Sequence, residues 1–323
     1  MQITTVGVLG GTGFVGRHLV NRLHADGYRV RVLTRRRERH RDLLVIPTLQ
    51  LIEVDVHDPA RLIDAFSGCD AVVNLVGILN EKGDDGRGFH RAHVALAEIV
   101  VDACKIHNIA RLLHMSALNA SPNGPSHYLK TKGTAEEHVH AASATGVRVT
   151  SFRPSVIFGP EDSFLNRFAA LLRLAPVLPL ARASARFAPV YVGDVVEAFA
   201  RALTLPASFG QRYDLCGPRV YTLGELVAYV KQLIGARCWI VHLSDRSSKW
   251  QANIMEHVPG KPLSRDNLRS LSVDSVCSGT NGLLTLGVAP TPLETIAPQY
   301  LAHRYAKARY AEYRSEAGRA RAY

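Results

Sequence analysis

Short apolar runs alternate with amphipathic stretches along the first half of the chain. The apolar runs predict strands at residues 6–9, 29–34, 49–54, 71–75, 112–115 and 147–152. Between them, apolar residues spaced three and four positions apart predict helices at 15–25, about 91–105 and 128–142. Asp58 followed by Pro59 marks the start of another helix, with the aspartate as its cap. Strands that alternate with helices predict the α/β class, as a Rossmann-type, doubly wound parallel sheet covered on both faces.

The pattern loosens after residue 154. Helices are expected at 164–174, at 195–203 with Asp194 as cap, and at 226–234, where Thr222 and Glu225 form a capping box. A short strand is expected at 190–192. Trp239 and Trp250 are expected to pack inside this second part or to line a substrate pocket. We expect a Rossmann domain over 1–160, to which 186–215 return, and a smaller C-terminal α+β cap in most of 161–323.

The composition is that of a globular protein, with 47% hydrophobic and 21% charged residues. It argues against disorder, collagen and coiled coil, and no apolar run approaches the roughly 20 residues of a membrane span. The net charge is +11, and the excess is concentrated in arginines at 35–41 and in the tail 304–323. Such clusters favour a phosphate group, an anionic lipid surface or an acidic partner. We expect no nucleic-acid partner, because no nucleic-acid-binding motif accompanies the charge.

The cysteines and histidines indicate neither a disulfide framework nor a metal. The five cysteines are odd in number and form no C-x-x-C pair, which predicts a reduced, intracellular chain. The first predicted strand begins at residue 6, which leaves no room for a signal peptide, so a cytoplasmic location is expected. His90 and His93 have the helical spacing of metal ligands but no third ligand beside them. We expect them to be exposed helix histidines.

A glycine loop lies between the first strand and the first helix. Gly10, Gly13 and Gly16 follow the spacing G-x-x-G-x-x-G. The missing side chains allow a tight turn and let a pyrophosphate approach the backbone, while the helix N-terminus offers unpaired N–H donors. The loop therefore predicts a dinucleotide site. Its candidate contacts are Gly10, Thr12, Gly13, Phe14, Val15 and Gly16.

The choice between nicotinamide dinucleotides is made at the end of the second strand. An acid there binds the ribose 2′-hydroxyl of NAD, but the chain has no acid between Tyr28 and Arg37. Arg35 is the leading candidate for a 2′-phosphate contact, with Arg36 or Arg17 helping, because a guanidinium fork binds phosphate well. We therefore expect NADP(H) rather than NAD(H), with several arginines of the cluster in contact with solvent alone.

The ends of other strands supply further candidates at the same edge of the sheet. Asp55 ends the third strand, where it could meet the adenine amino group. Asn74 and Gly77 end the fourth strand, although Asn74 fits a structural hydrogen-bonding role equally well. The remaining candidate contacts are Val56, Val76, Pro154 and Ser155.

Tyr128 and Lys132 lie one turn apart on the helix that follows the fifth strand. An ammonium beside a phenol favours the phenolate, which predicts a lowered pKa for Tyr128. Lys132 could also bond the nicotinamide ribose, and Tyr128 could exchange a proton with a substrate oxygen while hydride moves. Glu136, one turn further on, is expected to ion-pair on that face.

These elements resemble the short-chain dehydrogenase/reductase superfamily, in its extended or atypical branch. The matching motifs are Gly10-x-x-Gly13-x-x-Gly16, Asp55, Asn74-x-x-Gly77 and Tyr128-x-x-x-Lys132. Within that branch the chain is similar to the NADPH-binding accessory subunit of respiratory complex I and its bacterial relatives, over nearly its whole length. The stretches that carry this likeness are 114–120, 128–133, 154–166, 189–195 and 287–294.

Two positions depart from the pattern of active members of the superfamily. Active members usually place Ser or Thr just after the fifth strand; here Ser116 stands one position early, which leaves Ala117 in that place. His93 stands where the helix after the fourth strand often begins with Asn. Ser116 is still a candidate catalytic residue, together with Tyr128 and Lys132.

The resemblance implies a cofactor-dependent assembly or stability role at a respiratory NADH:quinone oxidoreductase, because the complex I relative is regarded as holding NADPH without turnover. It implies contact with subunits of the respiratory complex or with an anionic membrane surface, at the inner face of a respiratory membrane. Two alternatives stay open. One is an active oxidoreductase or a sugar-nucleotide epimerase or dehydratase that uses Tyr128 and Lys132. The other is a regulator that binds a protein partner according to the NADPH/NADP⁺ ratio.

Overall fold

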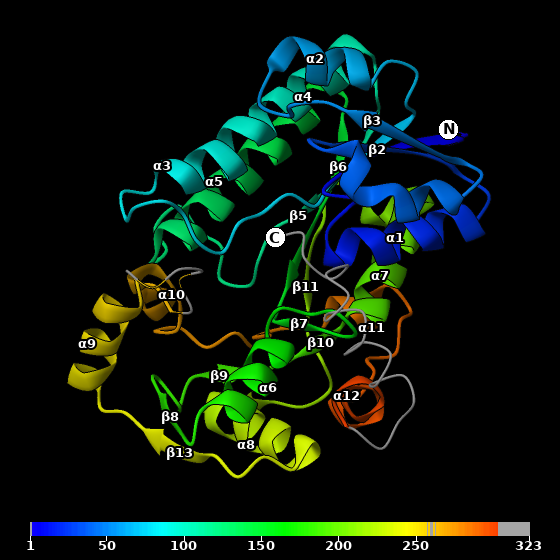
Figure 1. Ribbon diagram of the computed structural model, residues 1–323. Helices are drawn as coiled ribbons and strands as arrows, with labels where there is room; N and C mark the ends of the chain where they lie inside the picture. Colours follow the sequence, from blue (N-terminus) through cyan, green and yellow to red (C-terminus); the bar gives the residue numbers. More distant parts are fainter. Residues whose placement is uncertain (1, 257, 259–260, 262, 303–323) are drawn as a thin grey trace.

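Seven parallel strands form the central sheet, in the spatial order β11-β6-β5-β4-β1-β2-β3 (Figure 1). The computed structural model describes residues 2–256, 258, 261 and 263–302, so the basic tail 304–323 lies outside the described residues. The strand order reverses between β1 and β4, and ligands of such sheets bind beyond the carboxyl ends at this point. The strands are β1 (Thr5–Leu9), β2 (Arg29–Thr34), β3 (Leu49–Glu53), β4 (Ala71–Asn74), β5 (Arg111–Met115), β6 (Arg148–Pro154) and β11 (Arg212–Leu215).

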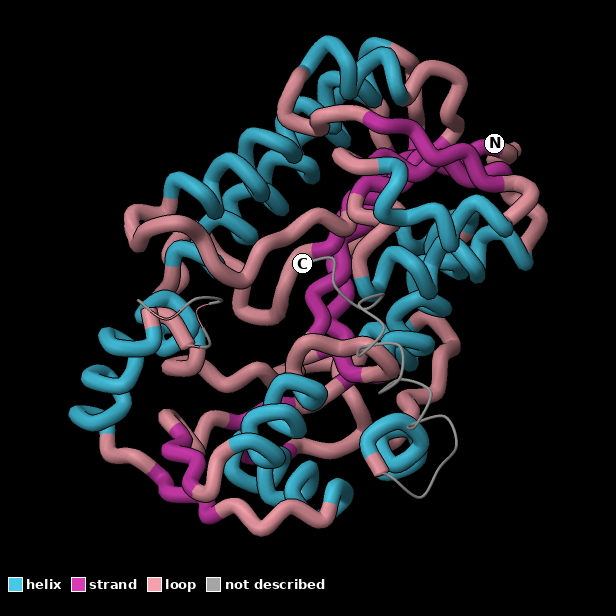
Figure 2. The backbone as a smooth tube through the Cα atoms, viewed as in Figure 1, coloured by secondary structure: helices cyan, strands magenta, loops and turns pink. Residues whose placement is uncertain are grey.

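Helices cover both faces of the sheet, as the alternation of strands and helices predicts (Figures 1 and 2). On one face α1 (Phe14–Ala25) and α7 (Val192–Thr204) enclose one hydrophobic core with the sheet. On the other face α2 (Pro59–Ala65), α4 (Leu96–Ile106) and α5 (His127–Ala141) enclose a second core. The fold is therefore the doubly wound α/β sheet that the sequence predicts. Shorter helical turns of this half are η1 (Arg37–Val45), α3 (Arg87–His90), η2 (Arg91–Ala95), η3 (Ala142–Thr145) and η4 (Pro206–Ser208).

Most of the remaining elements form the cap, which begins directly after β6, whereas α11 (Gly282–Thr285) packs into the first core beside α7 and β11. Three two-stranded sheets pair β10 with β7, β12 with β9, and β13 with β8. A third core, around Phe158, Leu226 and Leu293, holds the cap together. After β6 the chain passes into the cap. It then returns to the Rossmann half to form α7 and the edge strand β11, and passes into the cap again. The elements of the cap are β7 (Ile157–Phe158), α6 (Leu165–Leu174), β8 (Val177–Leu180), β9 (Arg186–Phe187), β10 (Val190–Tyr191), β12 (Tyr221–Thr222), α8 (Leu223–Ile234), β13 (Trp239–His242), α9 (Asp245–Met255), α10 (Arg265–Ser270) and α12 (Leu293–Leu301).

The sequence correctly predicts the N-terminal caps of two helices, and its prediction for a third helix is wrong. Asp58 accepts a hydrogen bond from the Arg61 backbone at the start of α2, and Thr222 forms the capping box of α8. Asp194 does not cap the helix predicted to follow it. That helix begins at Val192, and the Asp194 carboxylate instead accepts bonds from the Thr291 backbone (2.7 Å) and hydroxyl (2.8 Å). The Asp194 carboxylate is thus engaged with Thr291, which is distant in the sequence, and does not cap its own helix.

The prediction of a chain without disulfides is wrong, since Cys216 and Cys277 are bonded to each other. Cys216 follows β11, and Cys277 lies in the segment between α10 and α11, 61 residues further along the chain. No local pattern connects two cysteines at that separation. Cys69, Cys104 and Cys238 are free and buried.

The two tryptophans also differ from expectation. Trp239 and Trp250 are 75% and 70% exposed, so the prediction that they pack inside the cap is wrong. Trp250 does line a cavity, between α9 and the ends of β8 and β13, so the alternative of a pocket-lining tryptophan stays a prediction. None of the helices within the described ranges combines the length and the apolar character needed to cross a bilayer.

Candidate functional site

The glycine loop turns tightly between β1 and α1. Gly10 has a φ of +75°, which favours glycine, and its carbonyl oxygen accepts a bond from the Gly13 N–H at 3.0 Å. Helix α1 begins at Phe14, and among the described residues no side chain caps its first turn. The first N–H groups of α1 therefore face the loop with a positive dipole end, which suits a phosphate group.

The loop is also packed too closely to carry side chains. A Cβ atom at Gly16 would lie 2.1 Å from the Gly10 carbonyl oxygen, and one at Gly10 would lie 3.3 Å from the Val76 nitrogen. The loop therefore rests against both α1 and the chain after β4, at the strand-order reversal. This cradle fits the diphosphate of a dinucleotide. Thr12 lies in this turn, and Phe14 and Val15 are the first two residues of α1.

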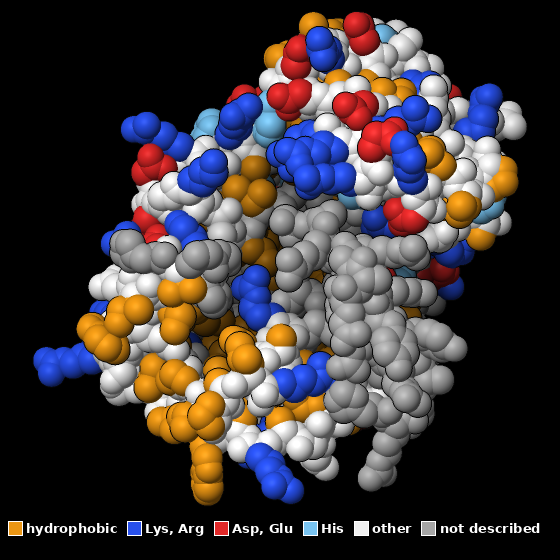
Figure 3. Space-filling model, in the orientation of Figure 1, with side chains coloured by type: hydrophobic (Ala, Val, Ile, Leu, Met, Phe, Trp, Pro, Cys, Tyr) orange, Lys and Arg blue, Asp and Glu red, His pale blue; other side chains and the backbone are white. Residues whose placement is uncertain are grey.

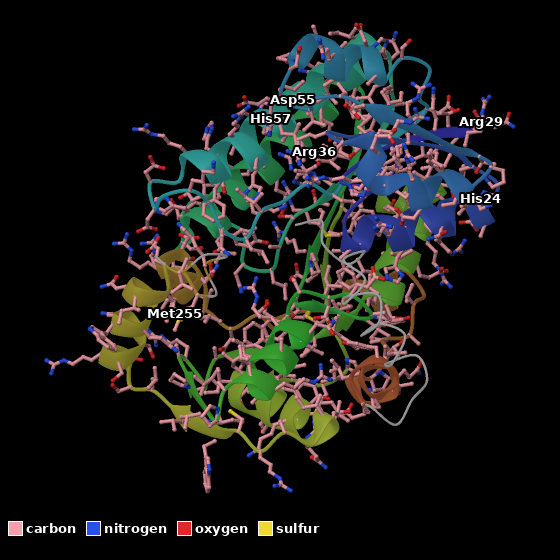
Figure 4. All side chains as sticks on the ribbon, viewed as in Figure 1. His24, Arg29, Arg36, Asp55, His57 and Met255 are labelled. Carbon is pink, nitrogen blue, oxygen red and sulfur yellow. A yellow bond between two sulfur atoms is a disulfide. The ribbon has the colours of Figure 1, made fainter. Side chains whose placement is uncertain are left out.

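Basic side chains gather beside the loop, at the end of β2. Arg35 and Arg36 are exposed there, and Figure 4 places Arg36 at the same end of the molecule as Asp55 and His57. Figure 3 shows a dense group of basic side chains in this region. Burial and then the Arg91 guanidinium lower the pKa of His57, with a smaller contribution from Arg35. Arg91 thus belongs to this basic rim, although sequence reasoning missed it, because it follows the long loop after β4.

Two side chains near the rim are already engaged within the protein. Arg17 pairs with Asp42, and its Nε donates to the Thr12 carbonyl at 3.1 Å. It therefore holds the loop and is a weaker candidate for a 2′-phosphate contact than Arg36. Asp55 accepts a bond from the His57 backbone at 3.0 Å.

Asn74 shapes the chain at the end of β4. It is 2% exposed, and its Oδ1 accepts a bond from the Val76 N–H at 3.1 Å. This contact fits the structural role that the sequence left open for it. Three residues further along, a Cβ atom at Gly77 would lie 3.1 Å from the Lys132 Nζ. The absence of a side chain at Gly77 therefore leaves space for the lysine ammonium. Val56 and Val76 are half-buried beside the second core.

Lys132 reaches the carboxyl ends of β4 and β5. Its Nζ donates to the Met115 carbonyl at 2.9 Å and to the Val76 carbonyl at 3.3 Å. Burial lowers the pKa of Lys132 to about 8, and the Glu136 carboxylate opposes this shift. Glu136 itself forms ion pairs with Arg153 and Arg212, as expected for a carboxylate on this face.

Tyr128 lies one turn before Lys132 on α5, is half-buried and packs against two rings. Its ring centroid is 5.7 Å from that of His93 and 6.1 Å from that of Phe89. Burial raises the pKa of Tyr128 to about 12. The prediction of a lowered phenol pKa is therefore wrong: burial sets the shift, and the Lys132 ammonium is directed at backbone carbonyls instead.

His93 is buried, at 2% exposure, so its predicted exposure on a helix surface is also wrong. Its Nε2 accepts a bond from the Ile78 N–H at 3.2 Å, which places the proton on Nδ1, 2.9 Å from the Thr131 hydroxyl. Burial lowers its pKa well below the usual range, so the ring is neutral. His93 thus ties the loop after β4 to α5.

The serine candidates differ in what their hydroxyls do. Ser116 is buried, and its Oγ has no hydrogen-bond partner among the described residues. The Ser155 Oγ donates to the Ser275 carbonyl at 2.7 Å and accepts from the Ala188 N–H at 3.2 Å. The Ser155 hydroxyl is therefore engaged, and the Ser155 N–H and the Pro154 carbonyl are hydrogen-bonded to Leu215 and Leu118. The Ser116 hydroxyl is buried without a partner in the part of the chain that the structure describes.

The cap reaches the same helix through Asp266, which sequence reasoning missed. The two Asp266 oxygens accept bonds from the backbone N–H groups of His127 (2.7 Å) and Tyr128 (3.1 Å), at the start of α5. Asp84, His127 and Asp266 lie close enough to hold a metal ion. However, Arg269 forms ion pairs with both Asp84 and Asp266. The guanidinium therefore already supplies the positive charge that a metal ion would bring.

Comparison with known proteins gives consistent relatives. The sequence model of the NAD dependent epimerase/dehydratase family matches residues 6–224. The mitochondrial NADH dehydrogenase (ubiquinone) 1 alpha subcomplex subunit 9 of Rattus norvegicus is 30% identical over 295 residues, covering 89% of this chain and 77% of that protein. A protein named ceramide reductase, from Caulobacter vibrioides, is 31% identical over 248 residues, covering 74% of each chain.

Solved structures agree on the fold. A nucleoside-diphosphate-sugar epimerase from Staphylococcus aureus has a TM-score of 0.70 at 19% identity, covering 90% of this chain and 98% of that one. Identity at this level speaks for a common fold and leaves the activity open.

Proposed function

The chain belongs to the NAD dependent epimerase/dehydratase family and is a relative of the mitochondrial NADH dehydrogenase alpha subcomplex subunit 9; on this premise we propose that it binds NADP(H) and serves the assembly or stability of a respiratory NADH:quinone oxidoreductase. One observation carries the proposal. The side-chain-free turn at Gly10 and Gly16 fits a dinucleotide, whereas the phenol of Tyr128 is packed among rings with a raised pKa. A phenol with a raised pKa is a poorer proton donor near neutral pH, which supports nucleotide holding over turnover.

The preference for NADP(H) over NAD(H) rests on the rim beside the loop. Arg35 and Arg36 are exposed at the end of β2, and Arg91 lies near them. The acids at the end of β3 accept bonds from backbone N–H groups, Glu53 from Arg37 at 2.7 Å and Asp55 from His57 at 3.0 Å. These exposed guanidinium groups at the end of β2 support the binding of a 2′-phosphate there.

Each site residue then has a defined task. The loop and the first turn of α1 bind the diphosphate, and Arg35 with Arg36 binds the 2′-phosphate. Lys132, held at the ends of β4 and β5, bonds the ribose. Ser116 follows β5 with a buried hydroxyl that has no partner among the described residues. A bound nicotinamide supplies hydride-transfer chemistry, but Ala117 stands where a substrate-binding hydroxyl would be expected.

The respiratory complex is supported as partner by the relative that is named a subunit of NADH dehydrogenase. We place the protein at the inner face of the respiratory membrane. Because a ligand bound only to the folded state stabilises it, the nucleotide would keep the chain in the form that the partner recognises.

The test begins with the purified full chain. Mass spectrometry of the nucleotide released on denaturation should find NADP(H), and NADPH should raise the melting temperature more than NADH. In native gels of detergent-solubilised membranes, the chain should then migrate with NADH:quinone oxidoreductase. The Arg35→Asp/Arg36→Asp variant, with the glycine turn intact, should lose both the nucleotide and this comigration. Comigration that persists without nucleotide, or none at all, would contradict the structural role.

A second candidate is an NADP-dependent carbonyl reductase. It is favoured by Tyr128 and Lys132 on one helix and by the relative named ceramide reductase. Here Tyr128 would give its proton to the carbonyl oxygen as hydride reaches the carbon. Turnover of a lipid carbonyl with loss of NADPH absorbance distinguishes this candidate from the structural role.

A further inference from the structure

Large apolar side chains lie exposed on two strands and one helix of the cap. They are Val177 on β8, Trp239 and Val241 on β13, and Trp250 and Ile254 on α9. We call these five residues the tryptophan face. Trp239 is paired with Val177 in the parallel register of β13 and β8, so these two apolar residues are neighbours in the two-stranded sheet. Figure 3 shows hydrophobic side chains crowded over α9, β8 and β13, at the lower left.

Helix α9 presents its large side chains outward. Its buried positions are Ser248 and Ala252, and the Ser248 hydroxyl has no hydrogen-bond partner among the described residues. Its exposed positions include Trp250 and Ile254, one turn apart. A helix of a globular protein normally buries its largest apolar residues and exposes the small and polar ones. The reversed arrangement indicates that the outer face of α9 is made for an apolar environment outside this chain.

A groove runs between α9 and the corner of β8 and β13. It is a cavity of about 570 Å³, lined on the helix by Trp250, Ile254 and Met255, and across from them by Pro179 and Leu243. The tryptophan face is therefore hollowed as well as exposed, with room for an acyl chain beside the indole of Trp250.

Cations surround this apolar area. Arg237, Arg246 and Lys249 are exposed around it, and Arg246 also lines the groove. Between residues 237 and 255 the sole acid is Asp245, which pairs with Arg182 at 3.2 Å. The charge that remains is positive and lies among the apolar side chains. Protein interfaces are depleted in lysine, whereas exposed tryptophan with Lys and Arg beside it is typical of a bilayer interface.

We propose that the tryptophan face docks onto the surface of a bilayer that contains anionic phospholipid. The indoles and Ile254 enter the boundary between headgroups and acyl chains, an acyl chain occupies the groove, and Arg246 and Lys249 meet phosphate groups. The inference deepens the membrane location of the proposed function and rests on it. It uses residues outside the nucleotide site, so a failure of vesicle binding is distinguishable from a failure of NADPH binding.

The chain offers a direct probe of this contact, because Trp239 and Trp250 are its two tryptophans. Their fluorescence in the full-length protein should shift to shorter wavelength with vesicles of phosphatidylcholine and phosphatidylglycerol. Brominated acyl chains should quench it, and vesicles of phosphatidylcholine alone should do much less. Sedimentation with vesicles without any change in emission would mean that another part of the chain, such as the basic tail, makes the contact. Absence of sedimentation would favour a protein partner. Either result overturns the proposal.

Matched variants separate docking from folding. Trp250→Ala and Ile254→Ser should each weaken the vesicle partition coefficient, the tryptophan change by roughly tenfold. Leu284→Ser, which alters an apolar side chain that is 59% exposed on α11, should leave it unchanged. Lys249→Glu should weaken binding to anionic vesicles more than Lys249→Gln does. All variants should keep the NADPH affinity of the wild type. An equal effect of Leu284→Ser and Ile254→Ser would refute the assignment of this face.

Discussion

The backbone N–H of Tyr128 donates to the Asp266 carboxylate at 3.1 Å, although 138 residues separate the two in the chain. The second oxygen of Asp266 accepts from His127 at 2.7 Å. A residue of the cap thus completes the first turn of the helix that carries Tyr128 and Lys132. Cap and nucleotide site are therefore mechanically coupled at this point.

Replacing that carboxylate should loosen the helix start. We expect Asp266→Ala to lower the free energy of unfolding by about 1–2 kcal/mol, as for loss of a helix cap, and to weaken NADPH binding through Lys132. Urea denaturation and nucleotide titration measure the two effects. Asp245→Ala, at an exposed first-turn acid of α9, should change stability by about 0.5 kcal/mol or less. Equal losses in the two variants would show that Asp266 has no special role.

The glycine turn should not tolerate a methyl group. In Gly16→Ala the new Cβ would meet the Gly10 carbonyl oxygen at 2.1 Å, so the loop must move. Overpacking of this kind costs about 1–3 kcal/mol, and we expect NADPH affinity to fall by roughly tenfold to a hundredfold. Calorimetric titration gives the affinity, and circular dichroism reports whether the fold survives. Gly279→Ala is the control, since a Cβ there meets nothing within 4 Å.

The arginine rim should discriminate between the two dinucleotides. We expect Arg35→Asp to raise the Kd for NADPH by roughly tenfold to a hundredfold and to change that for NADH much less, because only NADPH carries the extra phosphate. Arg41→Asp alters the same cluster at a residue that pairs with Glu38, and it should spare the selectivity. Parallel loss of affinity for both nucleotides after Arg35→Asp would remove the basis of the NADP(H) preference.

Removal of the Tyr128 hydroxyl separates the two candidate functions. Under the structural role, Tyr128→Phe should leave NADPH affinity, melting temperature and comigration with the respiratory complex unchanged. If the protein is a reductase, the same change should lower turnover by roughly 10²–10⁴-fold, as for loss of a general acid. Stopped-flow absorbance with a lipid carbonyl substrate provides the readout. A substrate that is reduced equally by both proteins would exclude Tyr128 as the acid.

Lys132 should leave a signature in the pH dependence of stability. Burial lowers its pKa from 10.5 to about 8 in the folded chain, so between these values the unfolded chain binds more protons. Stability contributed by this residue therefore rises as pH rises from about 8 to 10.5, by up to about 3 kcal/mol. The difference in unfolding free energy between the wild type and Lys132→Met should follow that slope. A difference that is flat across this range would contradict the lowered pKa.

Local patterns in the sequence account for most of the nucleotide-binding half. Apolar runs locate its strands to within a residue or two, since strands buried on both faces must be continuously apolar. The glycine spacing identifies the turn, because only residues without side chains fit there. The family resemblance is confirmed by a sequence match over residues 6–224 and by a relative that is 30% identical.

The features that sequence reasoning missed depend on distant partners. Asp266, the Cys216–Cys277 bond and the contact of Asp194 with Thr291 each join segments at least 61 residues apart. The burial of His93 depends on α5, which closes over it. Trp239 and Trp250 were misplaced for another reason: size and hydrophobicity predict burial on average, and a surface made for an external apolar phase breaks that rule.

The position of β11 at the edge of the sheet has a consequence for biosynthesis. β11 pairs with β6 in parallel, yet it is encoded after α6, β8 and the other elements of the first cap segment. A ribosome must therefore pass residue 215 before the seventh strand exists. Until then β6 has an unpaired edge, and α7 has not finished leaving the ribosome. Premature termination upstream of Leu215 would therefore release an incomplete, aggregation-prone sheet.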